Sequence, residues 1–271
     1  MPLSVCATPI GNLHDVTLRV LAELRAADLV LCEDTRRTRL LLERHGVQAV
    51  RLLSYHEHNE AARVDQVLPR LAAGERVALV SDSGLPAISD PGARLVSAAH
   101  AAGVPVTVLP GASAVETALV ASGLVGERYQ FVGYLPRREG ERAELWRELA
   151  AWPHAVVGFE SPRRLPAALA SLAAVLPERP AAVCRELTKR FESVERGTAS
   201  ELAARFGEPP KGEITLVLGP APAAASGDAG LAEAAAAVAE LVASGVPRRL
   251  AADVASRLSG RPRNELYDAS L

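Results

Sequence analysis

Short apolar runs alternate with longer amphipathic runs over the first two thirds of the chain, and this alternation constrains the fold more than any other feature. Short runs rich in Val and Leu are typical of buried strands, and longer runs with helical periodicity are typical of helices that cover a sheet. The clearest predicted strands span residues 29–32, 76–80, 104–109, 130–135 and 155–159, with two more near 180–185 and 213–218. The sequence therefore predicts an α/β fold.

Local capping signals mark where three of the helices begin. Asp90 followed by Pro91 predicts a helix that Asp90 caps and that Gly103 closes. Residues 113–116 and 198–201 both have the spacing of a capping box, in which a Ser or Thr and a Glu satisfy each other's backbone amides. Each of these signals fixes a helix boundary locally.

The pattern divides the chain into four parts. We expect an N-terminal α/β domain over residues 1–112 and a C-terminal α/β domain over residues 113–219. Residues 220–230 are rich in Pro, Ala, Ser and Gly without periodicity, which predicts a linker. Residues 231–271 contain three short helical patterns, which predict a small helical unit.

Composition and charge argue against several classes of protein. The net charge of −2 gives no general basic field for nucleic acid, and the N-terminus has no basic and apolar leader, so we expect a cytosolic protein away from membranes. The three cysteines are far apart and lie in apolar runs, which predicts buried free thiols rather than disulfides or metal ligands. Fingerprints of dinucleotide, phosphate-loop and zinc sites are missing from the sequence.

Polar and glycine-containing segments follow directly on the apolar strands. These segments span residues 8–12, 33–36, 81–84 and 110–113. Ligands bind at the carboxyl edge of open α/β sheets, so we expect the segments to converge on one cleft. Asp82 would suit a nucleotide or adenosyl ligand there, and Gly84 or Gly111 would let the main chain approach it. The alternative is structural, since Asp82 and both glycines also suit tight turns and Ser113 also suits a helix cap.

The order of the motifs carries a family resemblance. The motifs span residues 8–13, 33–36, 56–60, 89–92, 110–114, 122–124 and 185–189. Together they resemble the bacterial ribosomal RNA small-subunit methyltransferase I family, a branch of the tetrapyrrole methylase superfamily. The resemblance covers about residues 3–218 and extends more loosely to the tail around residues 264–267. It implies two α/β domains of the tetrapyrrole methylase type with the methyl donor, S-adenosylmethionine, in the cleft between them. It also implies a homodimer and transfer to the 2′-oxygen of a cytidine in the decoding region of 16S ribosomal RNA.

The resemblance also implies roles for individual residues. Donor contacts, mostly through the backbone and without metal, are expected from Pro9, Ile10, Gly11, Asp82, Gly84, Leu85, Ser113, Ala114, Phe159, Glu160 and Thr215. The preferred catalytic candidates, which accept the proton of the hydroxyl or favour the alkoxide, are Glu33, Glu186 and Lys189, with His56 and Glu57 also considered. Contacts to RNA are expected from Arg36, Arg37, His56, Arg163, Arg185, Arg248 and Arg249.

Other interpretations of the same residues stay open at this point. Glu33 and Glu186 also suit purely structural ion pairs with Arg36 and Arg185. A tetrapyrrole or other small-metabolite methylase would keep the same donor cleft but would need a broad apolar acceptor pocket. A non-catalytic RNA-binding assembly protein would use the arginine pairs alone, although surface arginines are usually only solvated.

Overall fold

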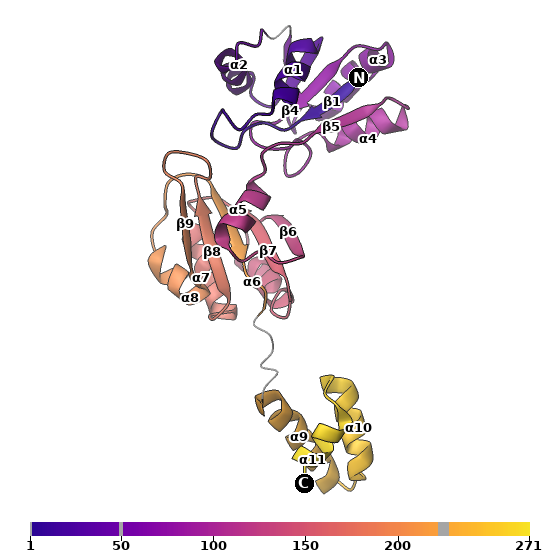
Figure 1. The fold of residues 1–271 in the computed structure, drawn as a ribbon, viewed down its shortest axis with the longest axis vertical. Coiled ribbons are helices and arrows are strands. Elements are labelled where there is room, and N and C mark those ends of the chain that lie inside the picture. The colour runs from indigo at the N-terminus through magenta and orange to yellow at the C-terminus, as the bar shows by residue number, and fades with distance from the viewer. Residues whose placement is uncertain (1, 49–50, 222–227) are drawn as a thin grey trace. The chain divides into compact units, whose positions relative to one another are not determined.

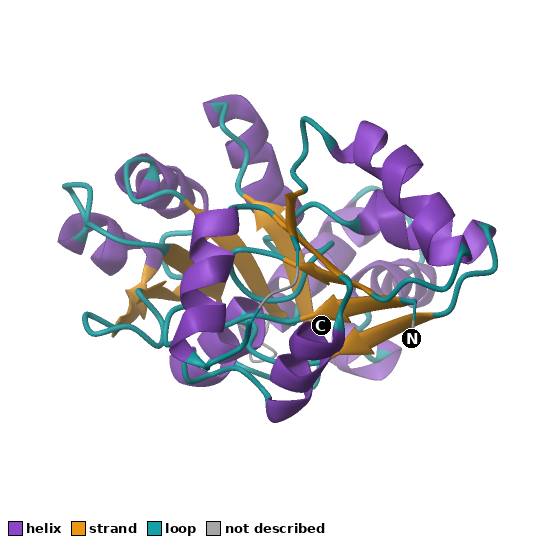
Figure 2. Cartoon of the chain, turned by 90° about the horizontal axis from the view of Figure 1, so that it is seen from above, coloured by secondary structure: helices purple, strands orange, loops and turns teal. Residues whose placement is uncertain are grey.

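The computed structural model describes residues 2–48, 51–221 and 228–271 (Figure 1). The chain divides into two compact units. The first comprises Met1–Ala150 and His154–Gly219, and the second comprises Ala151–Pro153 and Pro220–Leu271. The first unit contains both sheets, and helices pack around the strands in the view of Figure 2.

The first sheet is fully parallel. Its strands are β1 (Leu3–Cys6), β2 (Leu29–Cys32), β3 (Leu52–Ser54), β4 (Val77–Val80) and β5 (Val106–Leu109), in the order β3-β2-β4-β1-β5. The helices that follow four of the strands are α1 (Leu18–Ala26), α2 (Thr35–Arg44), α3 (Glu60–Ala72) and α4 (Ala93–Ala101). Residues of α1 and α2 pack in one core cluster of the sheet, and residues of α3 and α4 pack in another. The strands β1, β2 and β4 are buried along their whole length, as expected for parallel strands covered on both faces.

The second sheet is mixed. Its strands are β6 (Tyr129–Tyr134), β7 (Ala155–Glu160), β8 (Pro180–Arg185), β9 (Ser193–Thr198) and β10 (Ile214–Leu218), in the order β6-β7-β10-β8-β9. Only β6 and β7 are parallel, and the other neighbours are antiparallel. The helices are α5 (Ala114–Ser122), α6 (Glu139–Glu148), α7 (Leu165–Val175) and α8 (Ala199–Arg205).

Each core cluster of the second sheet contains its own helices. Residues of α6, α7 and α8 form one cluster, which includes the fully buried Trp146. Residues of α5 form the other cluster, in which Ile10 from the loop after β1 is also buried. Because Ile10 follows a strand of the first sheet, this core ties the two sheets of the unit together.

The α/β fold is confirmed, and the structure corrects several boundaries. Helix α4 begins at Ala93 with Gly92 at its N-cap, so the prediction that Asp90 caps this helix was wrong. Gly92 has a φ of +139°, which other residues rarely adopt and which turns the chain into the helix two residues later than the Asp-Pro signal suggests. Gly103 does follow the end of α4 in a left-handed conformation.

The two predicted capping boxes have different outcomes. Thr198 and Glu201 form the complete box at the start of α8. Ser113 does precede α5, but its hydroxyl donates to the carboxylate of Glu116 and makes no capping bond to the backbone, so that box was wrong.

The helical unit comprises α9 (Asp228–Ala243), α10 (Arg248–Ser259) and α11 (Arg263–Ala269). Its core contains Val238, Ala252 and Leu266, each buried. Helix α9 begins at Asp228, so it includes the last three residues that the composition assigned to the linker. Residues 222–227 of that linker lie outside the described residues.

The three cysteines are buried free thiols, as predicted. Burial raises the pKa of Cys6 and of Cys184 to about 12, so both thiols are inert near neutral pH. Among the described residues, no group of three or more His, Cys, Asp or Glu side chains is arranged to hold a metal ion. No helix in that part of the chain is both long enough and apolar enough to cross a membrane.

Candidate active site

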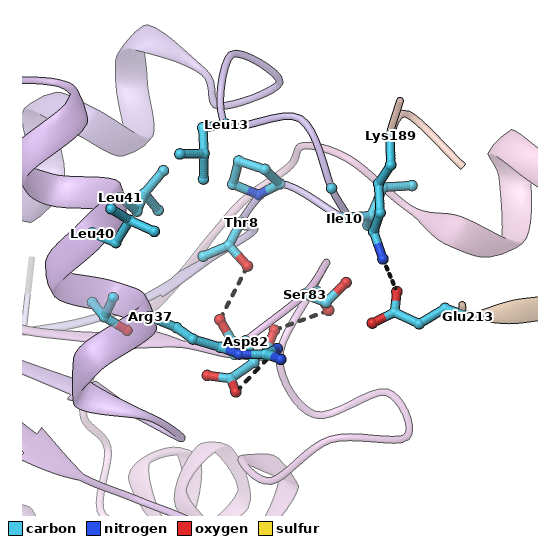
Figure 3. A pocket seen from close by; sticks show the side chains of 14 residues that line it. Thr8, Ile10, Leu13, Arg37, Leu40, Leu41, Asp82, Ser83, Lys189 and Glu213 are labelled. Atoms are coloured by element: carbon cyan, nitrogen blue, oxygen red, sulfur yellow. Dashed lines mark hydrogen bonds and ion pairs between the residues drawn. The ribbon is translucent and has the colours of Figure 1, made fainter. Parts of the chain in front are cut away.

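The loops after β1 and β4 are joined at the carboxyl edge of the first sheet. The N–H of Thr8 donates to the carbonyl of Gly84 over 2.8 Å, and the N–H of Gly84 donates to the carbonyl of Thr8 over 3.1 Å. The hydroxyl of Thr8 also donates to the carbonyl of Ser81 over 3.1 Å (Figure 3). Gly84 has a φ of +80°, so this turn favours glycine. The predicted convergence of the strand exits is confirmed for the loops after β1 and β4, whereas the segment of residues 33–36 contributes Glu33 to a separate cavity.

A cavity of about 470 Å³ lies beside these loops, and we call it the inter-sheet cavity. Loops that follow strands of the first sheet, strands of the second sheet and α5 line it. The predicted donor contacts along its wall are Ile10, Gly84, Leu85, Ser113, Ala114, Phe159, Glu160 and Thr215. Its volume falls in the ordinary range for small-molecule sites, roughly 300–1,000 Å³.

The other three predicted donor residues line a neighbouring cavity of about 230 Å³, which we call the Lys189 cavity. These residues are Pro9, Gly11 and Asp82, and Figure 3 shows the side chains around them. Glu213 lines both this cavity and the inter-sheet cavity, so the two are adjacent.

Gly11 is required by the packing of the protein itself. A Cβ atom at this position would lie 2.5 Å from Cγ of Lys189 and 2.7 Å from Oγ1 of Thr188. The next residue, Asn12, donates its N–H to Oγ1 of Thr188 over 3.0 Å. The loop after β1 and the loop after β8 therefore approach so closely that only glycine fits between them.

Glu160 is the one buried carboxylate in the wall of the inter-sheet cavity, within the described part of the chain. Its Oε1 accepts the N–H of Ser161 over 2.6 Å and lies 2.5 Å from Nη2 of Arg164. Its Oε2 is buried and has no hydrogen-bond partner among the described residues. Buried polar atoms are rarely left unpaired, so Oε2 is available to an N–H or O–H group of a ligand in this cavity.

The carboxylate of Asp82 contacts the loop after β2 and the first turn of α2. Its Oδ1 accepts the N–H of Asp34 over 3.0 Å, and its Oδ2 lies 3.5 Å from Nη1 of Arg37. Asp82 thereby fixes the loop after β4 to the start of α2. These contacts give Asp82 a structural role at the edge of the site, although they reach another loop and helix rather than the tight turn that the sequence suggested as the alternative.

A third cavity, of about 480 Å³, lies beyond the loop after β4, and we call it the β2-exit cavity. Glu33, His56 and Asp90 are in its wall. Asp90, together with Ser89, also lines the inter-sheet cavity, so this short segment separates the two spaces. Ser89 and the nearby Ala87 have φ values of +59° and +73°, a strained conformation that often marks functional loops.

The pKa values of two carboxylates beside this segment, Asp90 and Glu33, are raised. Burial is the main cause that raises the pKa of Asp90 to about 7, the charges of Glu33 and Asp82 add to it, and a hydrogen bond from Ser81 opposes it. Burial and the charge of Asp82 also raise the pKa of Glu33. A carboxylate with a pKa near neutrality is suited to accept a proton at physiological pH.

The sequence reasoning missed Asp90, because the Asp-Pro pair indicated a helix cap. The signal that was available is the motif of residues 89–92 itself, which the resemblance includes. The motif is held in place by Glu60, whose Oε1 accepts the N–H of Gly92 over 3.1 Å and the hydroxyl of Tyr55 over 2.9 Å. The motif of residues 56–60 thereby positions the loop that carries Asp90.

The three predicted catalytic residues do not lie together. Glu33 lines the β2-exit cavity, whereas Lys189 lines its own cavity and lies 2.9 Å from both Glu186 and Glu213 (Figure 3). The backbone N–H of Glu213 and the ammonium of Lys189 lower the pKa of Glu186. Glu186 is therefore a weaker base than Glu33, whose pKa is raised.

The structural ion pairs considered for Glu33 and Glu186 were wrong, because both arginines have other partners. Arg36 lies 2.8 Å from Asp34. Arg185 donates to Oγ of Ser193 over 3.1 Å and to the carbonyl of Lys211 over 3.3 Å.

The remaining residues predicted to contact RNA differ in exposure. Arg36, Arg37 and Arg163 are exposed on the first unit. In the helical unit Arg249 is exposed, whereas Arg248 is partly buried and donates to the carbonyl of Ser270 near the chain end. Arg248 thus has a structural contact that the sequence did not indicate.

Comparisons with known proteins agree with the fold. The sequence profile of the family described as Tetrapyrrole (Corrin/Porphyrin) Methylases matches residues 2–203. A protein from Micromonospora olivasterospora named Ribosomal RNA small subunit methyltransferase I is 44% identical over 268 residues, which cover 98% of this chain and 85% of that protein.

Solved structures of low identity share the fold. The methyltransferase CobJ matches with a TM-score of 0.62 at 20% identity, covering 81% of this chain and 94% of that one. A uroporphyrin-III C-methyl transferase from Thermus thermophilus, complexed with S-adenyl homocysteine, matches with a TM-score of 0.58 at 17% identity, covering 80% of this chain and 96% of that one. The chain belongs to the tetrapyrrole methylase family and, within it, to the group of ribosomal RNA small subunit methyltransferase I proteins.

Proposed function

We propose that this protein transfers a methyl group from S-adenosylmethionine to small-subunit ribosomal RNA. The observation that carries the proposal is the inter-sheet cavity, whose lining residues include Glu160, a carboxylate with a buried and unpartnered Oε2. The near full-length relationship to a protein named for this activity supports the substrate class. Relatedness at 44% identity also favours RNA over a tetrapyrrole as the acceptor.

The residues of the inter-sheet cavity fit the donor. An adenosyl and amino-acid ligand offers N–H groups to the carboxylate of Glu160, and apolar side chains such as Ile10, Leu85 and Phe159 line the same space. Gly84 brings main chain to the wall without a side chain. The donor supplies an electrophilic methyl group on a positively charged sulfur, and its departure leaves a neutral thioether.

The protein's own contribution is to position the acceptor and to remove its proton. Holding two reactants in a near-attack geometry contributes on the order of 7–11 kcal/mol, whereas a general base contributes about 10²- to 10⁴-fold in rate. Asp90 lines both the inter-sheet cavity and the β2-exit cavity, so it stands where the acceptor would meet the donor. We assign proton removal to Asp90 with Glu33 beside it, in preference to Glu186 and Lys189.

Three finer features complete the proposal. The acceptor atom is the 2′-oxygen of a cytidine in the decoding region, as the motif resemblance implies. The active form is a homodimer, and the protein acts in the cytosol. Apolar side chains are exposed on β5, α5 and β6, and they favour association of copies; these side chains are Val108, Val120 and Tyr129. Sedimentation of the purified protein tests the dimer directly, and a monomer at micromolar concentration would contradict it.

Labelled methyl transfer tests the activity. The protein is incubated with labelled S-adenosylmethionine and, in parallel, with unmodified small ribosomal subunits, with free 16S RNA, and with uroporphyrinogen. We expect label in the small-subunit RNA in one or both RNA samples and none in the tetrapyrrole. Label in the tetrapyrrole alone would replace the proposal with the small-metabolite methylase, and stable RNA binding without transfer would favour the assembly protein.

A further inference from the structure

The side chain of Asn59 has a fixed orientation beside His56. Its Oδ1 accepts the backbone N–H of His56 over 2.9 Å, and its Nδ2 donates to the carbonyl of Ser54 over 3.2 Å. If the oxygen and the nitrogen of this amide were exchanged, the amide nitrogen would face the N–H of His56, which is also a donor. The amide oxygen would face the carbonyl of Ser54, which is also an acceptor. The two backbone groups therefore fix the positions of Oδ1 and Nδ2 in the Asn59 amide.

The fixed amide decides the tautomer of the His56 ring. Nδ2 of Asn59 lies 3.0 Å from Nε2 of His56. Since Nδ2 is only a donor, Nε2 must be the acceptor, and the ring proton is then on Nδ1. His56 thus presents an N–H donor at Nδ1.

The Nδ1–H group has no partner in the described structure. The atom is buried, and it makes no hydrogen bond to any described residue. Buried polar atoms are rarely left unpaired, so such a donor on a residue in the wall of a cavity indicates a ligand acceptor. His56 lines the β2-exit cavity together with Glu33, His58 and Asp90.

We propose that His56 donates a hydrogen bond from Nδ1 to an oxygen of the methyl-accepting nucleotide, and that Asn59 is the positioning residue that fixes the required tautomer. The contact rests on the proposed function, because it names a residue that holds the acceptor substrate. The acceptor group is a hydroxyl or carbonyl oxygen, the class of atom that a single N–H donor recognises. His56 does not serve as the base, because its Nδ1 already carries a proton and its Nε2 is bonded to Asn59.

Nuclear magnetic resonance of the ring nitrogens tests the tautomer without any substrate. The chain has six histidines, so the spectrum of protein labelled with ¹⁵N at histidine is assigned to His56 by comparison with His56→Asn. We expect Nδ1 to be protonated and Nε2 to be unprotonated in the wild type above neutral pH. We expect Asn59→Ala to show exchange between the two tautomers. A proton on Nε2 in the wild type would overturn the inference.

Two substitutions of His56 test the contact itself. In His56→Asn the new amide nitrogen would lie near the place of Nδ1, whereas in His56→Gln the amide would lie near the place of Nε2 and its oxygen would accept from Asn59. The first variant therefore keeps the donor and the second loses it. We expect His56→Gln to lower kcat/KM on unmodified small-subunit RNA about tenfold more than His56→Asn does, which is the scale of one hydrogen bond. S-adenosylhomocysteine affinity, measured by calorimetry, should match the wild type in both variants, which serves as the control for folding.

The outcomes separate this contact from the proposed function. If the wild type is active and kcat/KM falls equally in the two variants, or falls less in His56→Gln, the contact alone would be overturned. A wild type that transfers no methyl to RNA would overturn the proposed function and the contact with it. If the His56 variants do not fold, Asn59→Ala tests the inference instead. Exchange between the two His56 tautomers in this variant, together with an unchanged kcat/KM, would contradict the inference.

Discussion

Glu160 and Arg164 form a buried ion pair in which only one carboxylate oxygen takes part. Nη2 of Arg164 lies 2.5 Å from Oε1 of Glu160, while Oε2 faces no partner among the described residues. The arginine thus offsets the charge of the carboxylate, whose second oxygen stays without a partner in the described structure. On this arrangement we propose that Glu160 binds the donor.

Glu160→Gln should weaken the binding of S-adenosylhomocysteine by about tenfold or more, because hydrogen bonds to charged groups contribute roughly 1.5–3 kcal/mol. Isothermal titration calorimetry measures the affinity. The exposed Glu178→Gln provides the matched control, and it should bind as the wild type does. Unchanged affinity in a folded Glu160→Gln variant would remove this carboxylate from the donor site.

Gly84→Ala should impair donor binding beyond its effect on folding. The added Cβ would lie 3.6 Å from Ile10 and 3.7 Å from the carbonyl of Ala112, ordinary contacts within the wall of the inter-sheet cavity. A positive φ costs alanine about 1–2 kcal/mol, so stability should also fall. We expect S-adenosylhomocysteine affinity to fall by about tenfold, or roughly 1.4 kcal/mol.

Gly74→Ala is the control for that backbone strain. Gly74 has a φ of +88°, close to the +80° of Gly84, and a Cβ there would meet nothing within 4 Å. It should lower the melting temperature about as much as Gly84→Ala while leaving donor affinity intact. Equal donor affinities in the two variants would show that the main chain at Gly84 does not border the ligand.

Asp90→Asn should change how stability and turnover depend on pH. The folded protein raises the pKa of Asp90 from an ordinary value of 3.8 to about 7, so the folded state holds this proton more tightly than the unfolded chain. The wild type consequently loses stability as pH rises from about 4 to about 7. Asn carries no charge, so the variant should gain melting temperature relative to the wild type, and the gain should be larger at pH 8 than at pH 4.5.

The same substitution tests proton removal. Single-turnover methyl transfer by the wild type should rise with pH through about 7 as Asp90 ionises. The Asp90→Asn variant should be slower by about 10²-fold or more and should lose this rise. A variant with the wild-type rate and pH profile would shift the assignment to Glu33.

Deleting residues 228–271 should preserve donor binding and weaken engagement of RNA. These residues pack around their own core, which includes Val238 and Leu266, so their removal leaves both sheets complete. The exposed Arg249 and Arg257 are available for phosphate contacts. Methylation at limiting RNA and constant salt measures the effect, because phosphate contacts weaken steeply with salt. Equal rates for the truncated and complete proteins would exclude a role for these helices in binding RNA.

The sequence predicted those features that depend on neighbouring residues along the chain. The buried strands, the capping box at Thr198 and the loops at the strand exits all have local patterns. Strand β9 was missed because this edge strand is only partly buried and has a single apolar side chain, Val194, so it contains no apolar run. Strand β3 was missed because it is only three residues long.

Contacts between segments that lie far apart along the chain could not be predicted from the sequence. The position of Asp90 between two cavities depends on Glu60, which binds the backbone of Gly92 from another helix. The need for glycine at position 11 depends on the loop after β8, which lies far away in the sequence. Such contacts exist only once both sheets have formed.

The chemical nature of the product tests the central claim most directly. Small-subunit RNA methylated by the protein with labelled donor is hydrolysed in alkali, which needs a free 2′-hydroxyl to cleave each linkage, and the products are identified by mass spectrometry. We predict that the label is recovered in an alkali-resistant dinucleotide whose first residue is a 2′-O-methylcytidine. Recovery of the label in a mononucleotide with a methylated base, or failure to label the RNA at all, would contradict the account.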